Sequence, residues 1–219
     1  GADVSNEALP FMGVLETTAG GVFVRVFRIS FSGELAYELA CPWGYGEALW
    51  ARCMQAGAAF AITPYGTEAL SILRIEKGHP AGPELDGRTT AADLGLARLV
   101  SKAKTCVGQV LAGRPGLADP ERPALVGLQP VDPDARLRGG AHLVADPQHA
   151  SSATDLGWTS SVHYSPHVGA YVALAFAAGG LERWQGRRLW AVYPLKDEAV
   201  EVEVTNPCFV DPEGARLRG

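Results

Sequence analysis

The sequence has no strong excess of either charge and no long apolar run. Its 219 residues include 19 Lys and Arg against 24 Asp and Glu, which gives a formal net charge of −5. A mildly acidic chain without a basic run argues against nucleic acid as the main partner. No apolar stretch approaches the length of a membrane span, and no basic segment followed by an apolar one opens the chain. We therefore expect neither a nucleic-acid nor a membrane partner, and the wide spacing of the four cysteines favours a cytoplasmic protein.

Cysteines and catalytic motifs are also scarce. The four cysteines are widely spaced, without a C-x-x-C pair, which suits buried thiols in a reducing compartment better than a disulfide framework or a zinc site. The chain lacks a P-loop, a Rossmann glycine fingerprint, an H-E-x-x-H sequence and a nucleophile elbow. His163 and His167 are four residues apart, but Pro166 between them argues against a helix that presents both to a metal. We expect no metal site.

What remains is the composition of an ordinary globular protein, with 47% hydrophobic and 20% charged residues. A chain of this length can form one large domain or two small ones. The first residue is Gly1 rather than Met, and apolar residues follow soon after it. We interpret the chain as a piece of a longer protein.

The first half of the chain predicts a mixture of strands and helices. Residues 9–41 are typical of strands with a hairpin at Gly20-Gly21. Residues 44–56 predict a helix, and Thr63-Pro64 predicts the start of a second helix that runs to about Lys77. Shorter helical turns are expected at residues 90–93, where Thr and Asp form a variant of the capping box, and at residues 106–111.

Glu34 is the first candidate site residue. Apolar and polar residues alternate through Val22, Val24 and Val26 as in a half-buried strand, and Ser32-Gly33 then interrupts the strand with turn residues. A carboxylate at such a corner can accept two hydrogen bonds from a planar N–H pair, as on an aminopyrimidine edge. A solvated turn residue is the alternative, because exposed glutamates are common.

Arg74 is the second candidate. It lies within the apolar residues of the helix that ends near Lys77, so we expect it to be buried. A buried arginine needs a partner, since an unpaired buried charge is strongly unfavourable. The partner could be a nearby acidic residue in a structural ion pair, or Arg74 could hold a charge in the wall of a pocket; the sequence leaves both open.

A linker rich in Pro, Gly and charged residues at 113–123 divides the chain. We predict a domain at residues 1–112 and another at residues 124–219. Regularly spaced short strands in the second domain predict a small antiparallel barrel or sandwich. The strands are expected at residues 124–129, 141–145, 158–162, 168–176, 188–193 and 199–205.

Four segments carry a resemblance to a known family. Residues 32–39 (SGELAYEL) resemble the T-G-E-x-G-x-E corner of the folate-binding aminomethyltransferases, the glycine-cleavage T-protein family. Residues 73–78 (LRIEKG) resemble that family's L-R-L-E-x-G helix, and residues 93–102 resemble the segment after it. Residues 157–169 resemble the G-x-V-T-S and S-P-x-L-G sequences of the C-terminal barrel. Within the family, residues 65–70 and the two ends of the chain are most similar to alpha subunits of heterotetrameric sarcosine oxidases.

The resemblance implies an α+β fold, with part of a folate-binding aminomethyltransferase-type domain followed by a small antiparallel β-barrel. It implies that the complex oxidises sarcosine to glycine at a flavin elsewhere and passes the methylene group to tetrahydrofolate, or releases formaldehyde. Glu34 would bind the pterin edge, Tyr37 would form a wall beside it, and Arg74 would orient a carboxylate. Flavin and NAD would lie outside this chain, and its partners would be the rest of the alpha subunit, the other oxidase subunits and reduced folate.

Departures from the family pattern leave alternatives. The family's acidic residue that assists the reacting folate nitrogen would lie upstream of Gly1, so no catalytic residue is assigned here and the chain alone should be inactive. A glycine-cleavage aminomethyltransferase is the first rival; Arg98, where that branch often has tryptophan, argues against it. The second rival is a non-enzymatic folate-binding factor for iron–sulfur cluster assembly, whose K-G-C-x-x-G-Q motif is one residue longer than residues 104–109. We expect Cys106 to be a buried small hydrophobe.

Overall fold

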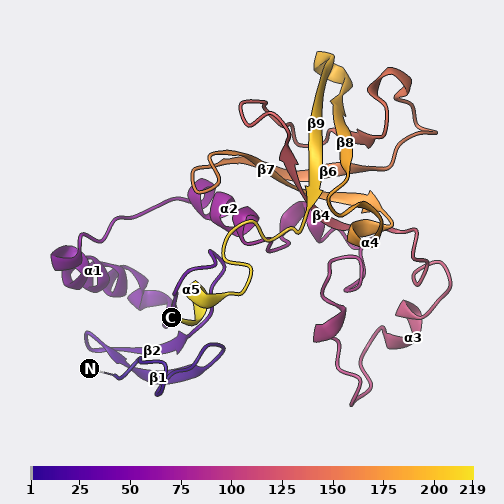
Figure 1. The fold of residues 1–219 in the computed structure, drawn as a ribbon. Coiled ribbons are helices and arrows are strands. Elements are labelled where there is room, and N and C mark those ends of the chain that lie inside the picture. The colour runs from indigo at the N-terminus through magenta and orange to yellow at the C-terminus, as the bar shows by residue number, and fades with distance from the viewer. Residues whose placement is uncertain (1) are drawn as a thin grey trace. The chain divides into compact units, whose positions relative to one another are not determined.

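The computed structural model describes residues 2–219 and divides the chain into two compact units (Figure 1). The first unit extends to Leu73 and also contains Asp211–Gly219. The second unit comprises Arg74–Val210. No helix among the described residues is long and apolar enough to cross a membrane.

The first unit contains a three-stranded antiparallel sheet in the order β1-β2-β3. Its strands are β1 (Val14–Ala19), β2 (Val22–Phe27) and β3 (Glu38–Ala40). Gly20 and Gly21 both have positive φ angles and form the predicted hairpin turn. The alternation in β2 is also confirmed, because its three valines are buried in a core shared with Leu9 and Leu49. Leu49 comes from α1 (Gly46–Gly57), the helix expected at 44–56.

Helix α2 (Thr67–Glu76) begins later than the sequence predicts. The hydroxyl of Thr63 donates a hydrogen bond to the carbonyl of Ala61 instead of capping a helix. The first helical hydrogen bond instead links the N–H of Leu70 to the carbonyl of Gly66. The helix therefore starts directly after Gly66 and not at the Thr-Pro pair. The remaining short helices are η1 (Trp43–Tyr45), η2 (Ala58–Phe60), η3 (Gly82–Glu84), η4 (Ala97–Leu99), α3 (Gln109–Ala112), η5 (Pro147–His149), α4 (Gly180–Trp184), η6 (Pro194–Lys196) and α5 (Ala215–Arg218).

The second unit contains a closed antiparallel barrel in the order β4-β7-β6-β5-β8-β9. All six strands predicted from the sequence are present, so the barrel is confirmed and the sandwich alternative is excluded. The strands are β4 (Pro123–Pro130), β5 (His142–Val144), β6 (Gly157–Ser165), β7 (Ala170–Ala178), β8 (Arg188–Tyr193) and β9 (Glu198–Thr205). Antiparallel pairing of β4 with β9 closes the barrel.

Strand β7 is buried on both faces. Its alanines at 173, 175 and 177 point into the main core with Leu128 and Val204. Its other face contributes to a second core that includes Ile75 from α2. Gly157 at the start of β6 is required by the close approach of this strand, because a Cβ there would lie 1.9 Å from the carbonyl oxygen of Phe176.

Cys106 is exposed, so the expectation that it is buried is wrong. The segment around α3 explains the difference: Val107 and Val110 are 106% and 86% exposed, so the apolar residues next to the cysteine are not packed into a core. The other three cysteines are partly buried, and all four are free thiols.

Candidate functional site

Glu34 lies in the loop between β2 and β3, which is longer than the expected corner. Gly33 has a φ of 86° and is buried, a conformation that favours glycine over any residue with a side chain. Its N–H donates to the Ser30 hydroxyl at 3.0 Å, and the Glu34 N–H donates to the Ser32 hydroxyl at 3.4 Å. Side-chain hydrogen bonds of this kind fix the turn, and with it the point where the Glu34 side chain leaves the backbone.

The carboxylate of Glu34 is accessible and pairs with an arginine far along the chain. Its Oε1 accepts a hydrogen bond from Nη1 of Arg216 at 2.9 Å. The two side chains are 45% and 48% exposed. Among the residues that the structure describes, no hydrogen bond to Oε2 of Glu34 is present. One carboxylate oxygen is thus held by the protein and the other can accept hydrogen bonds from a ligand.

Tyr37, from the same loop, packs against a buried arginine. The guanidinium of Arg28 lies 5.1 Å from the centre of the Tyr37 ring, within the range of a cation–π contact. The Tyr37 hydroxyl donates to the carbonyl of Val4 at 3.0 Å. Arg28 is 1% exposed and also donates through Nη2 to the carbonyl of Arg218 at 3.0 Å. Tyr37 is therefore held in place by the protein on one side while its side chain stays 36% exposed.

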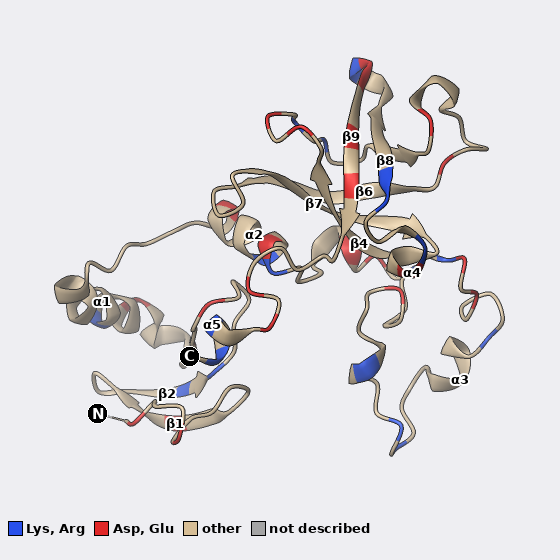
Figure 2. Cartoon of the chain, viewed as in Figure 1, with Lys and Arg blue, Asp and Glu red and all other residues tan. Residues whose placement is uncertain are grey.

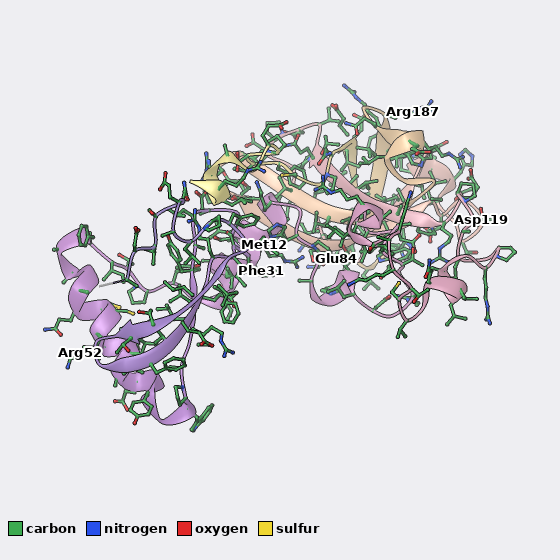
Figure 3. The ribbon with its side chains drawn as sticks, turned by 90° about the horizontal axis from the view of Figure 1, so that it is seen from below. Met12, Phe31, Arg52, Glu84, Asp119 and Arg187 are labelled. Atoms are coloured by element: carbon green, nitrogen blue, oxygen red, sulfur yellow. The ribbon has the colours of Figure 1, made fainter. Side chains whose placement is uncertain are left out.

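Arg74 lies in the second unit and is buried, as expected, with an acidic partner. Its Nη1 donates to Oε2 of Glu84 at 2.8 Å, and its Nη2 donates to the Ser161 hydroxyl at 2.7 Å. The Arg74 and Glu84 side chains are 7% and 0% exposed. Figure 3 labels Glu84 among the side chains. The structural ion pair that the sequence left open is thus present. A role of Arg74 toward a ligand stays a prediction.

Glu84 accepts hydrogen bonds from four groups. Besides Arg74, these are the hydroxyls of Ser160 at 2.5 Å and Ser161 at 2.7 Å, and the N–H of Ala81 at 3.0 Å. Burial raises the pKa of Glu84, but the two hydroxyls, the backbone N–H and the Arg74 charge outweigh burial, so the pKa is lowered overall. Glu84 is a carboxylate at neutral pH and anchors the loop after α2 to strand β6.

A bulge in β6 brings both serines to the same carboxylate oxygen. The pairing with β7 shifts between Thr159 and Ser161. In a regular strand, consecutive side chains point to opposite faces, but a bulge changes the direction of the extra residue. Ser160 and Ser161 therefore both donate to Oε1 of Glu84.

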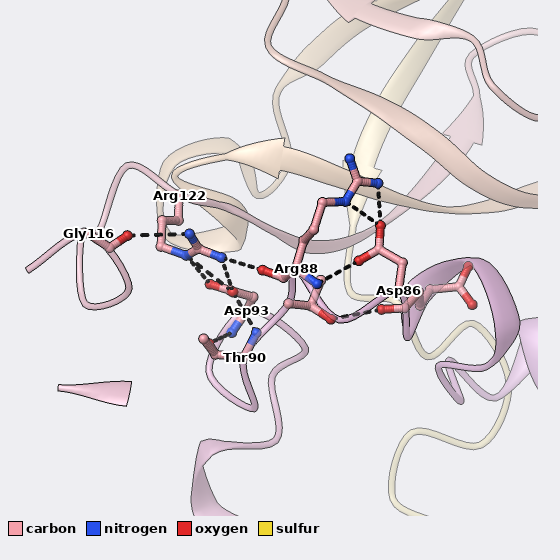
Figure 4. A network of polar contacts seen from close by, with 8 residues as sticks. Asp86, Arg88, Thr90, Asp93, Gly116 and Arg122 are labelled. Atoms are coloured by element: carbon pink, nitrogen blue, oxygen red, sulfur yellow. Dashed lines mark hydrogen bonds and ion pairs between the residues drawn. The ribbon is translucent and has the colours of Figure 1, made fainter. Parts of the chain in front are cut away.

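A second carboxylate–arginine network links Asp93 to Arg122, the residue directly before strand β4 of the barrel (Figure 4). Oδ2 of Asp93 accepts from Nη2 of Arg122 and from the N–H of Thr90, both at 2.8 Å. The N–H of Asp93 in turn donates to the Thr90 hydroxyl, so the predicted capping box is formed. The turn does not continue into a helix, because Gly95 adopts a φ of 71° and ends it before η4 begins at Ala97. Burial raises the pKa of Asp93, but the bonds from Arg122 and Thr90 dominate and lower it.

Three residues that contact the candidate site residues were not identified from the sequence. Arg28 follows Val22, Val24 and Val26 at the next alternate position, so the strand period could have placed it on the buried face. Glu84 and Arg216 lack such a signal, because both become partners through long-range contacts. Among residues 2–219, no group of three or more His, Cys, Asp or Glu side chains is arranged to hold a metal.

Two family models match the chain in order. The GCVT N-terminal domain matches residues 1–104, and the glycine cleavage T-protein C-terminal barrel domain matches residues 124–211. The chain belongs to the glycine cleavage T-protein family. This confirms the resemblance of residues 32–39 and 157–169 to that family and the α+β fold with a C-terminal barrel.

The similar proteins include sarcosine oxidase alpha subunits and aminomethyltransferases. The chain is 43% identical to sarcosine oxidase subunit alpha of Rhizobium meliloti (strain 1021), over 98% of the chain and 22% of that protein. It is 41% identical to the same subunit of Corynebacterium sp. (strain P-1), over 100% of the chain and 23% of that protein. The aminomethyltransferase of Mycobacterium tuberculosis (strain ATCC 25618 / H37Rv) is 31% identical, over 92% of the chain and 53% of that protein. The predicted similarity to sarcosine oxidase alpha subunits is thus confirmed, and the chain spans less than a quarter of their length.

A solved structure supports the fold. The crystal structure of glycine cleavage system aminomethyltransferase T from Bartonella henselae superposes with a TM-score of 0.77 at 23% sequence identity. The match covers 95% of this chain and 54% of that chain.

Proposed function

We propose that the chain is the folate-binding, one-carbon-transfer module of a sarcosine oxidase alpha subunit. The complex would demethylate sarcosine oxidatively to glycine and pass the methylene group to tetrahydrofolate, or release formaldehyde when folate is absent. The observation that carries the proposal is the difference in similarity, with 43% identity to the oxidase subunit against 31% to the aminomethyltransferase. Flavin and NAD would be bound elsewhere, and the rest of the alpha subunit and the other oxidase subunits would be the partners.

The Glu34 loop suits a reduced folate. An aminopyrimidine edge offers a planar pair of N–H donors, and a carboxylate accepts such a pair with one hydrogen bond to each oxygen. Each carboxylate oxygen can accept two hydrogen bonds, so the single bond from Arg216 to Oε1 of Glu34 leaves an acceptor site on both oxygens. The half-exposed ring of Tyr37, fixed by Arg28 and Val4, could form an apolar wall beside the ligand.

The protein would contribute mainly by positioning. Tetrahydrofolate, when bound, supplies the nitrogens that accept the one-carbon unit. Glu34 would orient the ligand through hydrogen bonds, and Tyr37 would restrict its movement. Holding two reactants in a fixed geometry can supply about 7–11 kcal/mol at best, because an encounter between separate molecules becomes a step within one complex. In this proposal Arg74 acts more remotely, by holding Glu84 and the loop after α2 in place.

A folate-binding iron–sulfur assembly factor is the second candidate, because Cys106 is exposed. An exposed thiol in the segment that resembles the assembly motif can react with metal or with an electrophile if it ionises readily. The rate of Cys106 alkylation at neutral pH distinguishes the two. Rapid modification of Cys106 relative to a small-molecule thiol would favour the assembly factor, and an ordinary rate would favour the oxidase module.

The main test is the variant Glu34→Gln in the full protein. Glutamine keeps the size of the side chain but loses the charge and one acceptor, so the dissociation constant of tetrahydrofolate measured by titration calorimetry should rise. Sarcosine oxidation, followed by reduction of the flavin, should stay near its native rate. The matched control is Glu16→Gln, which removes another surface Glu–Arg pair from the same unit, Glu16 with Arg25 at 2.7 Å. Unchanged folate affinity in the Glu34 variant would refute the assignment.

A further inference from the structure

The last residues of the chain form part of the Glu34 site. Helix α5 belongs to the same compact unit as the loop between β2 and β3. Arg28 from this loop donates to the carbonyl of Arg218 at 3.0 Å, and Asn6 donates through Nδ2 to the carbonyl of Gly219 at 3.2 Å. Because Arg28 is almost fully buried, the first of these bonds is shielded from water. The C-terminal segment is therefore fastened to the loop that carries Glu34.

Helix α5 is also fixed at its start. The carboxylate of Asp211 accepts from the N–H groups of Ala215 at 2.9 Å and Arg216 at 3.1 Å. Leu217, next to Arg216, is 9% exposed and so anchors the helix through burial. The backbone from which the Arg216 side chain extends is held by polar and apolar contacts together. Blue marks α5 in Figure 2, because two of its four residues are arginines, Arg216 and Arg218.

We infer that Arg216 is a positioning residue for Glu34, a role that rests on the proposed folate function. A half-exposed glutamate side chain samples several rotamers, and ordering it on ligand binding has an entropic cost. The contact between Nη1 of Arg216 and Oε1 of Glu34 restricts those rotamers before a ligand arrives. The contact uses one acceptor site of Oε1, so the second site of Oε1 and both sites of Oε2 stay available to the planar N–H pair of a pterin. Arg216 orients the carboxylate and does not touch the reacting atoms.

The test compares Arg216→Gln, Arg216→Lys, Glu34→Gln and the double variant Glu34→Gln/Arg216→Gln in the full protein. Titration calorimetry measures the dissociation constant of tetrahydrofolate for each. We expect Arg216→Gln to raise this constant roughly three- to fivefold, the size expected of a half-exposed ion pair. Lysine keeps the charge but not the planar group, so Arg216→Lys should recover part of the loss. Arg25→Gln, which breaks the other surface pair of the unit, is the matched control and should leave folate binding unchanged.

The double variant separates positioning from a general structural effect. If Arg216 acts through Glu34, its replacement should weaken binding no further once Glu34 is already glutamine. An additive loss in the double variant would overturn the inference, as would tighter binding in Arg216→Gln, since arginine would then compete with the ligand. Loss of affinity in Glu34→Gln with none in Arg216→Gln would overturn this inference and leave the proposed function standing. Unchanged affinity in Glu34→Gln would refute the proposed function itself.

Discussion

Two glutamate–arginine pairs in this protein have the same chemistry and opposite surroundings. Glu34 and Arg216 are both nearly half exposed and share a single contact at 2.9 Å. Glu84 and Arg74 are almost completely buried, and two serine hydroxyls and a backbone N–H complete the coordination of the glutamate. Glu34 and Arg216 are far apart in the chain, and Glu84 and Arg74 lie in different elements. Of the two pairs, only the first leaves a glutamate oxygen accessible.

The difference separates the carboxylate that we propose as a ligand-binding group from a structural one. A buried carboxylate must have its hydrogen bonds satisfied by the protein, because water cannot reach it. Glu84 therefore contributes to folding and has no oxygen to offer a ligand. An exposed pair contributes little to stability, but its carboxylate can exchange water for ligand donors. The site proposed at Glu34 depends on this weak protein coordination.

The largest expected effect comes from breaking the buried pair. Glu84→Ala should lower the free energy of unfolding by about 3–5 kcal/mol, because it leaves the Arg74 charge buried without a partner. Urea unfolding followed by tryptophan fluorescence measures the change. The matched control is Glu198→Gln, which breaks the more exposed pair with Arg138 in the same unit and should cost less than about 1 kcal/mol. Equal costs for the two variants would contradict the contrast between buried and exposed pairs.

The contribution of Glu84 to the stability of the fold should depend on pH. The pKa of Glu84 in the folded protein is lowered from its ordinary value of 4.5, so its stabilising contribution is complete above about pH 4.5. That contribution is lost as the pH falls through the lowered pKa, because the folded state must then take up a proton. The difference in unfolding midpoint between the native protein and Glu84→Gln should therefore narrow from pH 7 to pH 3. A constant difference across this range would show that the charge of Glu84 is not responsible.

Asp93 should show an intermediate effect. Asp93→Asn removes the charge that Arg122 binds and weakens the cap on Thr90, so we expect a loss of about 1–3 kcal/mol in unfolding free energy. The loss should be smaller than for Glu84→Ala, because the Arg122 side chain is 23% exposed and water can partly replace its partner. Thermal unfolding of Asp93→Asn provides the measurement. The control is Asp119→Asn in the linker, because Asp119 acts on Arg122 through its charge without a side-chain hydrogen bond.

The smallest effect on stability is expected at the proposed site. Glu34→Gln should change the unfolding free energy by less than about 1 kcal/mol, because both partners of its ion pair are solvated. Urea unfolding of the variant, set beside its folate affinity, completes the comparison. A loss comparable to that of Glu84→Ala would mean that Glu34 has a structural role instead of a binding one.

Local patterns predicted much of this fold. The Gly20-Gly21 hairpin, the alternating valines of β2 and all six barrel strands depend on turn residues and on a two-residue period that adjacent positions reveal. The start of α2 was predicted less well, because Thr63 bonds to a nearby carbonyl instead of capping the helix. The division of the chain at residues 113–123 and the folate contacts of Glu34, Tyr37 and Arg74 stay predictions.

The sequence by itself determined the family, the barrel and the need of Arg74 for a partner, since periodicity, motifs and the cost of a buried charge are properties of local sequence. Only the tertiary structure decided which groups meet. Glu84 and Ser161 are 77 residues apart, and Glu34 and Arg216 are 182 residues apart. No spacing in the sequence predicts either contact, because both form only when distant segments pack together. Packing therefore made one glutamate a buried anchor and left the other exposed, with an oxygen available to a ligand.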